Sequence, residues 1–152
     1  MEDPWSSLLT LEKYLVPKNN KWLKRICVVF GFILFDYFAT LAFCTNPTEE
    51  ANPHLRMFLE NYGIVVGLTM FDFLINLPIY LALCFDSHFV ILPTRLTKIV
   101  EPLVDLVLAW FLAGAHFSGA TSWFWIVPDL MRHAVGFGIY LIIAINLYST
   151  YG

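Results

Sequence analysis

The chain has 152 residues, of which 59% are hydrophobic, 17% aromatic and only 14% charged, and its formal net charge is −3. Soluble domains are roughly 45–50% apolar and about 25% charged, so this composition predicts a single integral membrane domain over residues 1–152. It excludes a nucleic-acid partner, since no basic tract of the necessary size is present. The three cysteines lack the spacing of a zinc motif or a disulfide framework.

Residues 3–16 are predicted to form a short helix at the membrane interface. Asp3 and Pro4 are residue types that start helices. Apolar side chains then recur at helical spacing, at Trp5, Leu8, Leu9, Leu15 and Val16. A short helix with one apolar face beside a membrane span lies in the plane of the interface. An ordinary helix that packs on a partner subunit is the alternative.

Four apolar runs are predicted to span the bilayer, because a hydrocarbon core of about 30 Å needs roughly 20 helical residues. They cover residues 23–44, 62–85, 99–118 and 132–148. Gly63 and Gly67 in the second run form a GxxxG pair, which permits the close approach of another helix. The predicted fold is an all-α bundle of four transmembrane helices with a short N-terminal interfacial helix.

The distribution of basic residues predicts the orientation of these spans. Seven basic residues flank one side of the membrane, namely Lys13, Lys18, Lys21, Lys24, Arg25, Arg95 and Lys98. Only Arg56 and Arg132 flank the other side. By the positive-inside rule the N and C termini face the cytoplasm, so we expect a multi-pass protein of the cell membrane.

Polar side chains inside the spans are expected to face the interior of the bundle, because lipid does not solvate them. Asp36 and Asp72 lie roughly 12–15 Å below the outer surface of the bilayer. Glu101 and Asp105 form a separate group toward the inner end. The outer group, which comes from all four spans and their outer loop, comprises Asp36, Thr40, Glu50, Asn52, Arg56, Asp72, Asn76, His116, Arg132 and His133.

Three interpretations of this outer group remain open. In the first it is a structural cluster, in which Asp36 or Asp72 pairs with Arg56, Arg132 or a neighbouring helix. In the second a divalent transition metal such as zinc, manganese or iron is bound by Asp36, Asp72, His116 and His133. In the third the carboxylates within the membrane form a path for protons or ions.

The stretch Asp36-Tyr37-Phe38-Ala39-Thr40, followed by Glu50-Ala51-Asn52-Pro53 and Arg56, resembles a family of small archaeal and bacterial membrane proteins of unknown function. In that family one helix carries D-x-x-x-T and its outer end carries E-x-N-P. The resemblance covers about residues 32–80. It implies that Asp36, Thr40, Glu50 and Asn52 form one unit. Independently of the family, Asn52 is expected to cap a helix that starts at Pro53.

The leading functional prediction is a non-catalytic, four-helix subunit of a larger membrane complex, whose partners are the lipid bilayer and other membrane subunits. The chain has short loops and no catalytic motif such as GxSxG or a P-loop. Two alternatives remain: a membrane enzyme with an Asp/His metal site, in which Glu50 acts as the base, and a proton or ion transporter.

Overall fold

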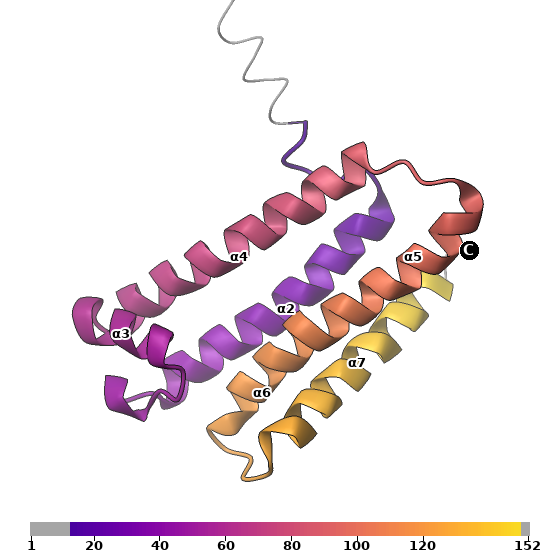
Figure 1. The fold of residues 1–152 in the computed structure, drawn as a ribbon. Coiled ribbons are helices and arrows are strands. Elements are labelled where there is room, and N and C mark those ends of the chain that lie inside the picture. Colours follow the sequence, from indigo (N-terminus) through magenta and orange to yellow (C-terminus); the bar gives the residue numbers. More distant parts are fainter. Residues whose placement is uncertain (1–12, 150–152) are drawn as a thin grey trace, which may run out of the picture.

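The computed structural model describes residues 13–149 (Figure 1). This part of the chain is built from helices joined by turns and short loops, and it contains no strand. In chain order the elements are α2 (Asn20–Phe43), the 3-10 turn η1 (Pro47–Glu49), α3 (Pro53–Tyr62), α4 (Ile64–Phe89), α5 (Thr94–Val107), the π-helical segment η2 (Leu108–Gly114), α6 (Ala115–Ser122) and α7 (Asp129–Ser149). The predicted all-α class is confirmed.

Three helices in the described range are long and apolar enough to cross a membrane: Asn20–Phe43, Ile64–Phe89 and Asp129–Leu147. The third predicted span differs from the expectation of one regular helix. There α5, η2 and α6 follow one another without a break from residue 94 to residue 122, with the π-helical segment in the middle. π-Helical segments are rare and occur frequently at functional sites.

Side-chain caps explain where two of these helices begin. The side chain of Asn19 accepts a hydrogen bond from the backbone N–H of Trp22 and so caps α2. The side chain of Asn52 accepts from the N–H groups of His54 and Leu55, and Pro53 occupies the first turn of α3, which confirms the predicted start of this helix. The predicted interfacial helix falls mainly on residues 1–12, outside the described residues.

The two glycines of the GxxxG pair have different roles. Gly63 has a φ of +78° and forms the sharp joint between α3 and α4. Gly67 is buried against α3, because a Cβ atom at this position would lie 2.4 Å from the carbonyl oxygen of Phe58. The predicted close approach therefore occurs, and it is made between α4 and the short helix that precedes it.

Helix α2 is the central element of the fold. Figure 1 shows α2 between α4 on one side and the α5–η2–α6 rod on the other, with α7 beyond the rod. The helix α4 packs mainly on α2 and α3 and lacks extensive contacts with the rod or with α7.

Two apolar clusters hold the elements together. One joins α2, η2 and α7 through Val29, Phe32, Ile33, Leu108, Ala109, Ala113, Tyr140 and Ala144; the other joins the end of α2 to α3 and α4 through Cys44, Leu55, Leu59 and Leu68.

Candidate functional site

Three polar pairs join α2 to the α5–η2–α6 rod, and their partners are always 80 positions apart. These pairs are Lys21–Glu101, Arg25–Asp105 and Asp36–His116. A constant difference in residue number means that the two helices run parallel and keep one register along their length. Between the second and third pairs, residues 26–35 of α2 and residues 106–115 of the rod are apolar. Several of them belong to the first apolar cluster.

The Arg25–Asp105 pair is buried at the end of the bundle opposite the outer group. Arg25 has no exposed surface, and its Nε and Nη2 donate to the two carboxylate oxygens of Asp105, each at 2.8 Å. The hydroxyl of Tyr140 on α7 donates to the same carboxylate at 3.3 Å. Asp105 was predicted to lie in a separate inner group, but its partner was not foreseen. This arrangement links α2, α5 and α7.

The third pair connects Asp36 to His116. The Nδ1 atom of His116 lies 2.8 Å from Oδ2 of Asp36, and both side chains are about four-fifths buried, with exposed fractions of 18% and 25%. Gly119, one turn further along α6, permits this contact, since a Cβ atom there would meet the Asp36 carboxylate at 2.8 Å. Of the partners expected for Asp36, it is therefore a neighbouring helix, and not Arg56 or Arg132, that supplies the bond.

The outer group lines one cavity of about 790 Å³, at the end of the bundle where α3 and α6 lie. Its lining comes from α2, α4, η2, α6 and the start of α7, together with the turn that leads into α3. All members of the predicted outer group except Arg56 line it, namely Asp36, Thr40, Glu50, Asn52, Asp72, Asn76, His116, Arg132 and His133. The predicted residues thus share one cavity, but its other polar lining residues, Glu49, Ser118, Ser122 and Asp129, were not in the predicted group.

Asp72 and Asn76 lie one turn apart on α4, and neither has a hydrogen-bond partner among the residues that the structure describes. Asp72 is half-buried and is close enough to Asp36 and His116 for their charges to act on it. Asn76 is only 5% exposed, and both its Nδ2 and its Oδ1 are buried without a partner in residues 13–149. Buried polar groups are normally paired, so this pair of side chains is the least satisfied part of the cavity wall.

The four predicted metal ligands line the same cavity without converging. Within residues 13–149 no three His, Cys, Asp or Glu side chains come together in a way that could hold a metal ion. The Asp36 and His116 groups bind each other. His133 instead packs between Gly114 and Trp110, with its ring centroid 4.5 Å from that of the indole. The described residues thus form one hydrogen-bonded carboxylate–imidazole pair, and they do not form the set of converging ligands that a metal ion needs.

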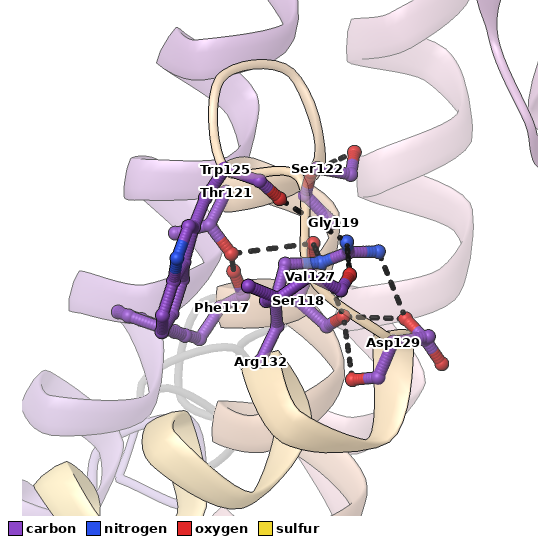
Figure 2. A network of polar contacts seen from close by, with 9 residues as sticks. All are labelled: Phe117, Ser118, Gly119, Thr121, Ser122, Trp125, Val127, Asp129 and Arg132. Carbon is purple, nitrogen blue, oxygen red and sulfur yellow. Dashed lines mark hydrogen bonds and ion pairs between the residues drawn. The ribbon is translucent and has the colours of Figure 1, made fainter.

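Arg132 was predicted as a partner for Asp36 or Asp72, and it has another role. Figure 2 shows its guanidinium surrounded by the end of α6 and the loop that leads into α7. It donates to the carbonyl oxygens of Ser118, Trp125 and Val127, at 3.2, 3.3 and 2.5 Å. Its planar fork of N–H donors suits these unpaired carbonyls. Arg132 also pairs with Asp129 at 3.4 Å, so it fixes the loop over residues 123–128 and, within the described part of the chain, forms no ion pair with Asp72.

Arg56 also binds a backbone carbonyl, and its expected pairing with Asp36 or Asp72 does not form. Its Nε and Nη2 donate to the main-chain carbonyl of Glu50, at 2.8 and 2.5 Å. The Glu50 carboxylate accepts from the N–H of Asn52 at 2.7 Å, as expected for a group beside exposed amides. Glu50 is buried at the rim of the cavity, and burial, reinforced by the charge of Asp36, raises its pKa.

Glu50→Gln is expected to weaken the pH dependence of folding. Because the folded-state pKa of Glu50 is raised, the stability it provides is complete below the ordinary glutamate pKa and is lost as pH rises through the folded pKa. Glutamine keeps the oxygen that accepts from Asn52 and carries no charge. At neutral pH the variant should be at least as stable as the parent, as measured by unfolding at pH 4 to 8.

Glu49→Gln is the matched control, with the opposite sign. Hydrogen bonds from the N–H groups of Thr45 and Asn46 lower the pKa of Glu49, so its contribution is present above the ordinary glutamate pKa and is lost as pH falls. Equal pH profiles for the two variants would contradict both assignments.

Comparisons with known proteins leave the resemblance to the D-x-x-x-T and E-x-N-P family as a prediction. No family model matches the chain, and no curated protein or solved structure is significantly similar to it.

Proposed function

We propose that the chain is a four-span membrane transporter that binds a small cation in the polar cavity and exchanges it for a proton at Asp72. One observation carries this proposal: the Asp72 carboxylate lies within a helix long and apolar enough to cross a membrane, lines the cavity, and forms no ion pair or hydrogen bond among the described residues. Ionisable groups in such positions normally mark the path of a substrate, an ion or a proton.

In this proposal the α5–η2–α6 rod is the fourth span, and both termini face the cytoplasm. Support for the span comes from the unbroken helix over residues 94–122, which is longer than the roughly 20 residues that a bilayer requires. Support for the orientation comes from Lys21, Lys24 and Arg25 at the start of α2 and from Arg95 and Lys98 at the start of α5. The cavity then opens toward the outside.

The cavity provides the groups that cation–proton exchange requires. A bound cation is neutralised by the Asp72 carboxylate, which must be ionised. When the cation leaves, a proton from water takes its place on the same carboxylate, so one positive charge replaces another. The hydrogen-bonded pair of Asp36 and His116 lines the same cavity.

The opposite half of the bundle is closed by the first apolar cluster and by the buried Arg25–Asp105 pair. Transport therefore requires a second conformation. The helix α4, with α3 attached, is the element best suited to move, because it packs mainly on α2 and lacks extensive contacts with η2, α6 and α7. A movement of α4 would change the position of Asp72 and Asn76 relative to the rest of the cavity.

The other two predicted functions have less support. For a subunit of a larger complex, the exposed apolar side chains of α4, α5 and α7 offer a surface, but lipid covers such a surface equally well. For a metal enzyme, the separation of the predicted ligands within residues 13–149 removes the main argument. The subunit role stays a prediction, which co-purification of a stoichiometric partner would support.

Uptake of radiolabelled guanidinium into proteoliposomes tests the proposal, because this cation keeps its charge and does not cross lipid as a neutral base. Vesicles with an acidic lumen should accumulate it above the level of protein-free vesicles. Asp72→Asn should reduce this uptake at least tenfold, whereas Asp86→Asn should not, since Asp86 lies on the same helix and does not line the cavity. Absent uptake by the parent, or uptake that survives Asp72→Asn, would refute the proposed function.

A further inference from the structure

We propose that the bound cation is amphipathic, with a head group that carries N–H donors between Asp72 and Asn76 and a single short alkyl chain in a second groove between α2 and α4. This inference rests on the proposed function, in that the cavity must bind a cation. It adds the substrate class, which the polar cavity alone does not define.

The geometry behind this inference is the position of Asp72 and Asn76 between two spaces. Both residues line the polar cavity, and both also line a groove of about 420 Å³ along the seam of α2 and α4. The two spaces differ in chemistry. The wall of the groove is apolar and aromatic, and apart from Asp72 and Asn76 it consists of Phe30, Ile33, Leu34, Tyr37, Thr69, Phe73, Leu77 and Tyr80.

The other polar groups of the groove are already paired. The hydroxyls of Tyr37 and Thr69 lie 2.9 Å apart and bind each other. The hydroxyl of Tyr80 donates to the carbonyl oxygen of Leu15 at 2.6 Å. Among the described residues that line the groove, Asp72 and Asn76 are the two whose side chains have no hydrogen-bond partner. An alkyl chain fits the rest of the wall, because apolar surface there gains from being covered.

The head group is defined by two acceptors. The Asp72 carboxylate favours a positive charge, and Oδ1 of the buried Asn76 amide, which has no partner among the described residues, is an acceptor for an N–H of the head group. A guanidinium or primary ammonium head supplies both the positive charge and the N–H donor. A hydrogen bond to the buried amide also removes the free-energy cost of leaving that amide unpaired in the ligand-free protein. An anionic phospholipid head is disfavoured, because its phosphate would face the carboxylates of Asp36 and Asp72. A bare metal ion is disfavoured by the lack of three converging ligands among residues 13–149.

A series of alkylguanidinium salts tests the inference by calorimetry on the purified protein in lipid nanodiscs. Methyl-, butyl- and hexylguanidinium share one head and differ only in chain length. Affinity should rise roughly threefold to fourfold for each added methylene until the groove is filled. Leu34→Trp should reduce the gain from methyl to hexyl, because Leu34 lines the groove and its side chain is half exposed, so that a larger ring can be accommodated.

Leu74→Trp is the matched control, since Leu74 is also a half-exposed leucine but lines neither space. It should keep the full gain from methyl to hexyl. Three results would overturn the alkyl-chain inference. They are equal affinities along the series, an equal gain from methyl to hexyl in both tryptophan variants, and a gain that is seen in short-chain detergent but lost in nanodiscs. The last of these would show that bilayer lipid occupies the groove. If methylguanidinium bound and required Asp72 in these cases, the proposed function would stand. If it failed to bind, or bound equally to Asp72→Asn, the function itself would fall.

Discussion

Arg25→Met is expected to destabilise the folded protein by about 3–5 kcal/mol, the cost of leaving a buried carboxylate without its ionic partner. The side chain of Arg25 is fully buried, and it gives both carboxylate oxygens of Asp105 a hydrogen bond at 2.8 Å. Met fills much of the same volume but supplies no donor. The difference in the free energy of unfolding can be measured by equilibrium denaturation in mixed micelles.

Two variants show whether the loss comes from the unpaired charge. Arg25→Met combined with Asp105→Leu removes both charges and should recover most of the lost stability. Lys21→Met breaks the next pair along the same two helices, whose side chains are each 35% exposed, and should cost less than about 1 kcal/mol. If the double variant were no more stable than Arg25→Met, the unpaired carboxylate of Asp105 would not be the cause of the lost stability.

Gly67→Val is expected to have the second-largest effect, a loss of about 2–3 kcal/mol or a failure to fold. A Cβ atom at Gly67 would lie 2.4 Å from the oxygen and 2.6 Å from the carbon of the Phe58 carbonyl. Both are backbone atoms, so α3 as a whole must move away from α4. Such a shift would also disturb the cavity rim next to α3, which the same denaturation assay and guanidinium uptake would detect.

Gly31→Ala is the control for this substitution. Gly31 is exposed within α2, and no atom lies within 4 Å of the position its Cβ would occupy. Alanine there should leave stability unchanged or raise it by up to about 1 kcal/mol, because it restricts the unfolded chain. Equal losses at Gly31 and Gly67 would show that the close approach of α3 and α4 is not the cause.

The number and limits of the long helices follow from local properties of the sequence. Apolar runs of about 20 residues predicted α2, α4 and α7 to within a few residues, and the Asn52-Pro53 pair predicted the start of α3. The third run is helical, as expected, but it is interrupted by a π-helical segment, and it is not among the three described helices that are long and apolar enough to cross a membrane. Its π-helical segment could not be foreseen, because the extra residue per turn responds to packing against α2 and α7, with Gly114 pressed against His133.

The register of the bundle was present in the sequence as an unused signal. Lys21, Arg25 and Asp36 have the same spacing as Glu101, Asp105 and His116, with complementary charges at the first two positions. Comparing the polar positions of pairs of spans would have aligned α2 with the rod. Arg25 was instead counted only for its effect on membrane orientation, so its buried role was missed.

The sequence by itself determined which residues are apolar enough to be embedded and which polar residues must face inward, because both depend on the solvation of each side chain. It therefore indicated several of the polar residues that line the cavity. Only the tertiary structure decided that Asp36 meets His116, that Arg56 and Arg132 bind backbone carbonyls, and that Asp72 and Asn76 have no partner among the described residues. These contacts join residues far apart in the chain or depend on how a side chain is aimed, and a rotation of a helix by a fraction of a turn would exchange one partner for another.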